Sequence, residues 1–364
     1  MNNLKIMTIL GARPQFIKAS ALSDLIFRSN KATEYIVHTG QHFDADMSQV
    51  FFDELNLPMP AVNLEISGGS HAEMTGRMLI GIEKEIVTQR PDVVLVYGDT
   101  NSTLAGALAA AKLEVPVAHV EAGLRSFNRS MPEELNRKVT DCLSQFLFTP
   151  TQLATSNLQR EGHTEDSIYQ VGDIMLDVAL NFGRLAEESP GEMIVYESTS
   201  RFALATIHRA ENTGSMARMS EIVFALCAAT EVIDIILPLH PRTRAALVEF
   251  DLIKVLSEKV RIIEPVGYLD MVRLEKGAAV IITDSGGVQK EAFFHKTPCI
   301  TLRGETEWME LVDSGWNRLV NPVTPQAILD ALAAADSSER EDVAPYGEGD
   351  AAKKIIDVLL AAQP

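Results

Sequence analysis

The chain has 364 residues, of which 46% are hydrophobic and 23% are charged, a composition that excludes a disordered protein. Its 50 acidic residues against 32 lysines and arginines give a formal net charge of −18. Nucleic acids and anionic membranes are bound by clustered Lys and Arg, so we expect neither as a partner. At this length two domains are expected rather than one.

The cysteines argue against a disulfide framework and against a structural zinc site. Cys142, Cys227 and Cys299 are an odd number of scattered thiols without C-x-x-C spacing. The histidines also lack ligand spacing, so we predict no metal. No leader precedes the first apolar segment and no uncharged apolar run approaches the length of a membrane span, so we expect a cytoplasmic protein.

Short apolar runs recur along the chain, and each is followed by a turn and a helical pattern. We predict strands in the first half at 4–10, 35–38, 93–97 and 115–120, and in the second half at 202–207, 235–239, 261–263 and 280–283. Between them, apolar residues at a four-residue spacing predict a helix at 71–89. This alternation is typical of βαβ units with parallel sheets.

The most linker-like stretch lies near the middle of the chain, at 187–193. We therefore predict an α/β protein with two doubly wound, Rossmann-like domains that face each other across a cleft. The first comprises 1–170 together with a returning C-terminal segment, 350–364, and the second comprises 171–349. Ligands of such sheets bind beyond the carboxyl ends of the strands, where we look for functional residues.

The turn after the first strand begins with Gly11, which permits close approach of the backbone to a ligand. The G-x-G-x-x-G fingerprint is absent, and this argues against a nicotinamide or flavin cofactor. Arg13 and Lys18 follow in this segment. They either reach an anion in the cleft or are ordinary solvated charges.

Three acidic residues follow the next strands. Asp99 is either an acid/base group or the N-cap of the following helix, and the local propensities favour the cap. Glu121 ends an apolar strand, where a carboxylate is costly unless it is paired or functional. Glu133 either begins a helix or converges with the other two. A carboxylate cluster spreads pKa values, so that one member holds a proton while another accepts one.

The second half offers groups suited to a phosphate. A single His after a strand is more often structural, but His208 directly precedes an arginine at a strand end, which raises the odds of phosphate contact. The last expected strand runs into Ser285, Gly286 and Gly287 and then a helix, so backbone N–H groups and the helix dipole favour an anion there. Glu291, one turn into that helix, either accepts hydrogen bonds from ribose or is an exposed helical residue.

Together these segments resemble the non-hydrolysing UDP-N-acetylglucosamine 2-epimerase family, which has the two-domain glycosyltransferase-B fold. The resemblance covers essentially the whole chain, and seven motifs in the same order carry it: Gly11-Ala-Arg-Pro, Tyr97-Gly-Asp-Thr, His119-Val-Glu-Ala-Gly-Leu-Arg, Met131-Pro-Glu-Glu, His208-Arg-Ala-Glu-Asn, Thr283-Asp-Ser-Gly-Gly and Pro345-Tyr-Gly-Glu-Gly.

The resemblance implies an isomerase that eliminates UDP from a UDP-sugar to give a 2-acetamidoglucal and adds it back with inverted C2. It implies no cofactor, a homodimer and a role in polysaccharide biosynthesis. The implied acid/base groups are Asp99, Glu121 and Glu133, with His208 at the diphosphate beside Arg13 and Lys18; Ser285, Gly286, Gly287 and Glu291 would hold phosphate and ribose. Gln41, His42 and Arg77 match a second, activating UDP-sugar site.

The chain departs from the family at two motifs. Gln15 replaces a common Glu, and Trp308 stands where many relatives carry Arg. Trp308 either stacks on the sugar or packs between the domains. UDP-N-acetylglucosamine is the first expected substrate, because it is the commonest substrate of the family. The alternative is a modified sugar such as a 2,3-diacetamido glucuronate, whose carboxylate would need a cation, with Arg303 or Arg209 available. A UDP-sugar glycosyltransferase, a hydrolysing epimerase and a UDP-sugar sensor are the rival functions.

Overall fold

The computed structural model describes residues 3–41, 52, 55, 57–188, 201–337 and 339–362. The chain forms two compact units, Met1–Val178 with Ala344–Pro364, and Ala179–Val343. The first change of unit falls within helix α7 (Ile174–Glu188), and not at 170/171 as placed from the sequence. The second falls at 343/344, before the Pro345 turn, where the sequence placed it at 349/350.

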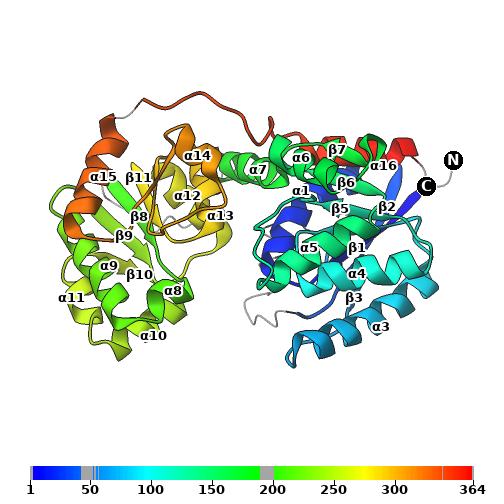
Figure 1. Cartoon of the computed structure of the whole chain (residues 1–364), viewed down its shortest axis with the longest axis horizontal. Helices are drawn as coiled ribbons and strands as arrows, with labels where there is room; N and C mark the ends of the chain where they lie inside the picture. Colours follow the sequence, from blue (N-terminus) through cyan, green and yellow to red (C-terminus); the bar gives the residue numbers. More distant parts are fainter. Residues whose placement is uncertain are drawn as a thin grey trace. The chain divides into compact units, whose positions relative to one another are not determined.

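The first unit is built on a seven-stranded sheet in the order β3-β2-β1-β4-β5-β6-β7 (Figure 1). All neighbouring strands are parallel. The strands are β1 (Leu4–Leu10), β2 (Ala32–His38), β3 (Val62–Asn63), β4 (Val93–Tyr97), β5 (Val117–Val120), β6 (Phe146–Thr149) and β7 (Ile168–Gln170). The chain order reverses between β1 and β4, which makes their carboxyl ends the expected ligand position of this sheet.

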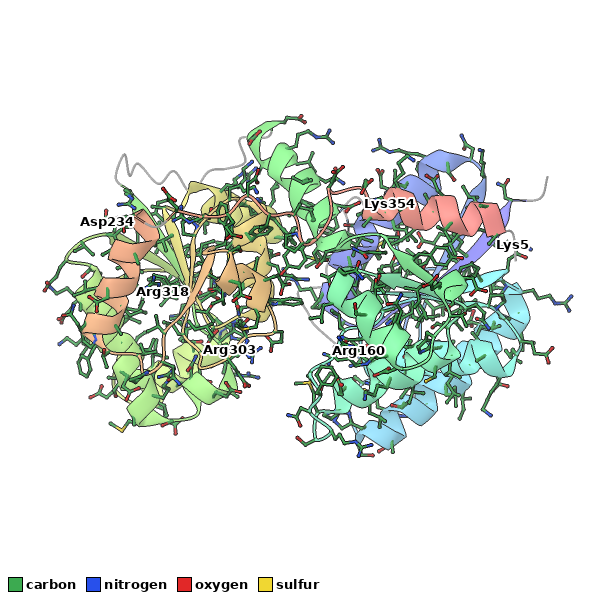
Figure 2. All side chains as sticks on the ribbon, turned by 45° about the horizontal axis from the view of Figure 1, so that its top comes forward. Lys5, Arg160, Asp234, Arg303, Arg318 and Lys354 are labelled. Atoms are coloured by element: carbon green, nitrogen blue, oxygen red, sulfur yellow. The ribbon has the colours of Figure 1, made fainter. Side chains whose placement is uncertain are left out.

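The helices of the first unit pack against this sheet and against one another. They are α1 (Arg13–Ser29), α3 (His71–Gln89), α4 (Asn101–Lys112), α5 (Pro132–Leu143), α6 (Gln152–Arg160), the start of α7 and α16 (Ala351–Ala362), with a short 3-10 turn at Glu165–Ser167. The predicted helix at 71–89 is confirmed as α3, and Met78, Ile82 and Ile86 of its apolar stripe are buried. Charged side chains such as Lys5, Arg160 and Lys354 lie on the exposed surface (Figure 2).

The C-terminal helix α16 returns to the first unit and packs against α1. Asp177 of α7 accepts the backbone N–H groups of Ala351 and Ala352 at 3.2 and 2.9 Å, and so caps the start of α16. Burial outweighs these hydrogen bonds and raises the pKa of Asp177 to about 6. None of the described helices has both the length and the apolar character needed to cross a membrane.

The second unit has a six-stranded parallel sheet in the order β10-β9-β8-β11-β12-β13. Its strands are β8 (Phe202–Thr206), β9 (Asp234–Pro238), β10 (Arg261–Ile263), β11 (Val280–Thr283), β12 (Cys299–Thr301) and β13 (Asn317–Leu319). Its helices are α8 (Ala210–Thr213), α9 (Met216–Ala229), α10 (Pro241–Glu249), α11 (Ile253–Ser257), α12 (Tyr268–Gly277), α13 (Gly286–Phe294), α14 (Met309–Asp313) and α15 (Pro325–Ser337).

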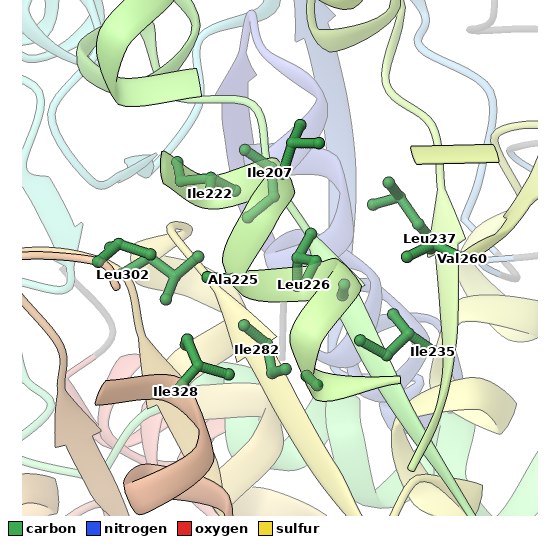
Figure 3. Close-up of a cluster of buried hydrophobic side chains, with 14 of the residues drawn as sticks. Ile207, Ile222, Ala225, Leu226, Ile235, Leu237, Val260, Ile282, Leu302 and Ile328 are labelled. Atoms are coloured by element: carbon green, nitrogen blue, oxygen red, sulfur yellow. The ribbon is translucent and has the colours of Figure 1, made fainter. Parts of the chain in front are cut away.

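The core of the second unit joins α9 and α15 to the face of the sheet. Ile222 and Leu226 of α9 meet Ile235 and Ile282 of the strands, with Ile328 of α15 beside them (Figure 3). Such fully buried aliphatic side chains contribute roughly 1.5–3 kcal/mol each to folding. This packing fixes the ends of β8 and β11, which are neighbours in the sheet and mark its reversal of chain order.

The predicted strands occur in the structure, four of them with the expected limits and four shifted by up to three residues at either end. Five strands were not predicted: β3, β6, β7, β12 and β13. Each is only two to four residues long. Runs this short carry little periodicity, although 261–263 and 280–283 were predicted, and pairing with a neighbouring strand decides whether they form strands.

Candidate active site

The turn after β1 is tied to the turn after β4 by the side chain of Gln15. Its oxygen accepts the N–H groups of Gly11 and Ala12 at 2.8 and 3.0 Å, while its nitrogen donates to the Tyr97 carbonyl at 2.8 Å. The Glu that is common in the family at this position has no N–H, so it cannot make the hydrogen bond that the Gln15 amide donates to the Tyr97 carbonyl. A Cβ on Gly11 would come within 2.0 Å of the Ser102 hydroxyl, which explains the glycine.

Lys18 of α1 lies at the carboxyl ends of β4 and β5 and forms an ion pair with Glu121. Both side chains are largely buried, at 18% and 6% exposure. Burial lowers the pKa of Lys18, but the charge and hydrogen bond of Glu121, with smaller effects of Asp99 and Asp173, raise it overall. Lys18 therefore stays charged and brings the predicted residues Asp99 and Glu121 into one electrostatic cluster.

Glu121 adopts a left-handed backbone conformation, with φ of 69°. This conformation is unfavourable for a residue with a side chain and is found at positions that the surrounding structure holds. Gly98, at φ of 64°, lies opposite, where a Cβ would be 3.5 Å from the Glu121 carboxylate. The carboxylate is thus held close to the β4 turn.

Asp99 is not the N-cap of α4, which corrects the expectation from local propensity. Thr100 caps the helix, because its hydroxyl accepts the Thr103 N–H. One Asp99 carboxylate oxygen instead accepts Nε and Nη2 of Arg137 at 3.0 and 2.6 Å. Asp99 remains 32% exposed and is therefore accessible to a ligand.

The first turn of α5 holds two acids with different surroundings. Glu134 is buried and accepts hydrogen bonds from the backbone of Ser126 and Phe127 and from Arg137. Burial raises its pKa, but these hydrogen bonds lower it overall. Glu133 is half-buried, and within the described residues the structure gives it no hydrogen bond or ion pair. Arg137 links this turn to Asp99, but among the described residues no hydrogen bond joins Glu133 to Asp99 or Glu121.

A fully buried network lies directly beneath these turns. His119 places Nδ1 2.7 Å from the Asp141 carboxylate and Nε2 2.8 Å from the Gly98 carbonyl. Asp141 also accepts Arg125 Nη2 at 2.6 Å and the Gly123 N–H at 3.2 Å. Burial raises the pKa of Asp141, but the charges and hydrogen bonds of His119 and Arg125 lower it overall.

In the second unit, the turn after β8 is held by a buried aspartate, Asp284, at the end of β11. Asp284 accepts the N–H groups of His208 at 3.1 Å and Arg209 at 3.0 Å, and the Asn212 side-chain amide at 2.9 Å. The His208 ring is 38% exposed, with Nδ1 3.6 Å from Asp284. His240 of the next turn packs at 5.5 Å from the His208 ring.

Helix α13 begins at the carboxyl end of β11 with the predicted glycines in its first turn. Ser285 is its N-cap and accepts the Val288 N–H at 3.5 Å. Gly286 and Gly287 supply the free first-turn N–H positions that suit an anion. Glu291, one turn on, accepts the Tyr268 hydroxyl at 3.4 Å, and burial raises its pKa against the smaller lowering effects of Lys290 and Tyr268.

Trp308 lies against this first turn. Its indole N–H donates to the Gly286 carbonyl at 2.9 Å, and Lys290 Nζ lies 4.5 Å from its ring centroid. Arg303, labelled in Figure 2, forms two 3.0 Å hydrogen bonds with Glu307, and Arg209 Nη2 is 3.9 Å from the same carboxylate. Arg303 and Arg209, the two arginines proposed to bind the carboxylate of a uronate, therefore both pair with Glu307 in this structure.

The residues matched to a second UDP-sugar site are only partly described. Gln41 accepts the N–H and hydroxyl of Ser102, at the start of α4, at 3.0 and 2.7 Å. Arg77 of α3 donates to the carbonyls of Ser67 and Gly68. His42 lies outside the described residues. None of the hydrogen bonds that the structure gives these two described residues joins Gln41 to Arg77.

Four residues that hold these turns were not assigned a supporting role from the sequence. They are Gln15, which was named only as a departure from the family pattern, and Arg137, Asp141 and Asp284. An Asp directly after a buried apolar strand is costly unless it is paired, and this was the available signal for Asp284; Asp141 lies within α5, where the sequence carries no such signal. In the described part of the chain, no group of three or more His, Cys, Asp or Glu side chains is arranged to hold a metal ion.

Known proteins resemble this chain over nearly its whole length. Residues 26–360 match the family model described as UDP-N-acetylglucosamine 2-epimerase. A UDP-2,3-diacetamido-2,3-dideoxy-D-glucuronate 2-epimerase of Pseudomonas aeruginosa is 50% identical over 98% of this chain and 99% of that protein. A UDP-N-acetylglucosamine 2-epimerase of Methanocaldococcus jannaschii is 45% identical over 98% of this chain and 99% of that protein.

The fold is shared as well. The crystal structure of Methanocaldococcus jannaschii UDP-GlcNAc 2-epimerase in complex with UDP-GlcNAc and UDP matches with a TM-score of 0.86 at 44% identity, covering 98% of this chain and 100% of that one. The predicted α/β class of glycosyltransferase-B type and the assignment as an isomerase are confirmed. The chain belongs to the UDP-N-acetylglucosamine 2-epimerase family.

Proposed function

We propose that this protein interconverts UDP-N-acetylglucosamine and UDP-N-acetylmannosamine without net hydrolysis. The observation that carries the proposal is the cluster of Asp99 and Glu121 around Lys18 at the ends of β4 and β5. A simple binding site for a dianionic nucleotide gains nothing from carboxylates placed there. The 45% identical relative bears the name of this activity.

The difficulty of the reaction lies at C2, which carries no adjacent carbonyl to acidify its proton. In the proposed reaction a carboxylate takes the C2 proton as the C1–O bond to UDP breaks, which leaves a 2-acetamidoglucal and UDP. UDP then adds back to C1 while another carboxyl returns a proton to the opposite face of C2. Asp99, Glu121 and Glu133 are the proposed acid/base groups, without an assignment of faces.

The leaving diphosphate gains negative charge and needs positive partners. Arg13 and His208 are the proposed groups, together with the first-turn N–H groups of α13 after Ser285. Glu291 is the proposed ribose acceptor. Asp284 supports this assignment indirectly, because it fixes the backbone on both sides of His208.

The test is proton NMR of the reaction in deuterium oxide. The proposal expects deuterium at C2 of both recovered UDP-sugars, with no accumulation of free sugar. Transfer to an acceptor would leave C2 protonated, and a hydrolysing epimerase would accumulate UDP and free sugar. A sensor would leave the UDP-sugar unchanged.

A second candidate substrate is a UDP-sugar with a carboxylate, such as the 2,3-diacetamido glucuronate named for the 50% identical relative. Arg303 and Arg209 both form ion pairs with the Glu307 carboxylate near Gly286. The two arginines could bind the carboxylate of a uronate if it displaced Glu307 from them. The comparison of kcat/KM for the two sugars decides between them. Preference for the plain sugar by both wild type and Trp308→Arg would exclude the uronate.

Three further properties belong to this proposal: a homodimer, a cytoplasmic location and a product used for a surface polysaccharide. A second, activating UDP-sugar site at Gln41, His42 and Arg77 also remains a proposal. Light scattering measures the oligomeric state. Sigmoidal dependence of rate on UDP-sugar that becomes hyperbolic in Arg77→Ala is the expected sign of activation.

A further inference from the structure

The imidazole of His119 is fully buried between two hydrogen-bond acceptors. On one side Nε2 lies 2.8 Å from the Gly98 carbonyl, which has no proton to donate. On the other side Nδ1 lies 2.7 Å from the Asp141 carboxylate. A neutral imidazole has only one N–H and would satisfy only one of these contacts.

Asp141 is not free to supply the missing proton. Its second oxygen already accepts Arg125 Nη2 at 2.6 Å and the Gly123 N–H at 3.2 Å. The guanidinium of Arg125 pairs with this oxygen and favours the ionised form of the Asp141 carboxyl, whatever the protonation of His119. Asp141 is therefore ionised and acts only as an acceptor.

We infer that His119 is a doubly protonated imidazolium and a positioning residue for the turns that carry Asp99 and Glu121. Nε2–H holds the carbonyl of Gly98, next to Asp99 in the chain. Nδ1–H binds Asp141, which also binds the N–H of Gly123. Glu121 lies between His119 and Gly123 in the chain. The Asp141 carboxylate therefore holds the backbone on both sides of Glu121, which has the left-handed conformation.

The charge of the ring matters for this geometry. If the ring lost one proton, a nitrogen lone pair would face either the Gly98 carbonyl or the Asp141 carboxylate at under 3 Å. That repulsion would release one of the two turns. The role in positioning rests on the proposed function of Asp99 and Glu121, whereas the protonation of the ring does not.

The first test is NMR of the full chain labelled with ¹⁵N-histidine at pH 7.5, where an ordinary exposed imidazole is mostly neutral. His119→Gln assigns the signals among the eight histidines. If that variant does not fold, replacement of the other histidines in turn assigns the remaining signal. We expect both ring nitrogens of His119 to show protonated shifts. A pyridine-type shift at either nitrogen would overturn the inference.

The second test separates positioning from binding. His119→Gln should lower kcat about 10²-fold, the scale of a displacement near 1 Å at reacting groups, and leave UDP affinity unchanged. His163→Gln is the matched control, because His163 is half-buried outside this network. Unchanged kcat in a folded His119→Gln would overturn the positioning role. Unchanged kcat in Asp99→Asn and Glu121→Gln would instead overturn the proposed function.

Discussion

Two buried aspartates hold the strand-end turns of the two units, and they are stabilised in different ways. Asp141 in the first unit contacts two basic side chains, His119 and Arg125. Asp284 in the second unit accepts the neutral N–H groups of His208, Arg209 and Asn212. Both side chains are fully buried.

The difference matches what each unit is proposed to do. Charges that compensate one another leave the first unit with ionised groups in fixed positions, as proton transfer at Asp99 and Glu121 requires. In the second unit neutral N–H groups hold the Asp284 carboxylate and so fix the turn that carries His208, next to the start of α13 where the diphosphate is proposed to bind. One architecture thus carries two kinds of electrostatic support.

The largest expected effect concerns turnover. Replacement of Asp99, Glu121 or Glu133 by its amide should lower kcat by roughly 10²–10⁴-fold, the range for general acid–base groups, and leave UDP binding largely intact. Steady-state kinetics and calorimetry measure the two quantities. Near-normal turnover in all three amide variants would remove the carboxylates from the mechanism. Glu165→Gln, on the exposed 3-10 turn, serves as the control.

The two aspartates should differ in stability when they are removed. Asp141→Ala removes the carboxylate that His119 and Arg125 share, and among the described residues only Arg125 of these two keeps another carboxylate, Glu161, so the change should cost about 3–5 kcal/mol of unfolding free energy. Asp284→Ala leaves neutral N–H groups unpaired and should cost about 1–3 kcal/mol. Urea unfolding measures both, with the exposed Asp357→Ala as control. Equal losses would contradict the distinction between the two units.

A third buried carboxylate, Asp177, should make stability depend on pH. Its pKa is about 6 in the folded protein, above the ordinary value near 4, so the folded state binds more protons between these values. Its contribution to stability is therefore present below about pH 4 and is lost as pH rises through about 6, by roughly 3 kcal/mol. Unfolding midpoints from pH 4 to 7 should lose this slope in Asp177→Asn and keep it in Asp357→Asn.

The smallest expected effect concerns binding. Arg13→Ala and His208→Ala should each weaken UDP affinity by about 10–100-fold, since a hydrogen bond to a charged group contributes about 1.5–3 kcal/mol. Turnover should fall as well, because the diphosphate gains charge in the transition state. Calorimetry that finds unchanged affinity in both variants would place them outside the site. Arg244→Ala, in an exposed ion pair with Glu264, is the control.

The sequence by itself determined the fold class, the strand ends and the family. Long apolar patterns such as 4–10 and 71–89 are local, and they became β1 and α3 with the expected limits. The turn at Gly98 is equally local, because its φ of 64° favours glycine, whereas Gly11 is required by a tertiary contact, since a Cβ there would lie 2.0 Å from the Ser102 hydroxyl. The seven motifs needed only their order in the chain.

Tertiary structure decided which polar side chains meet. Asp99 pairs with Arg137 and does not cap α4. Of the two acids at the start of α5, Glu134 and not Glu133 binds the backbone of the preceding loop. His119 and Asp141 lie 22 positions apart and pair only because α5 packs beside β5. Local propensity cannot weigh such contacts, since the cost of burying a charge is set by partners that folding brings from elsewhere in the chain.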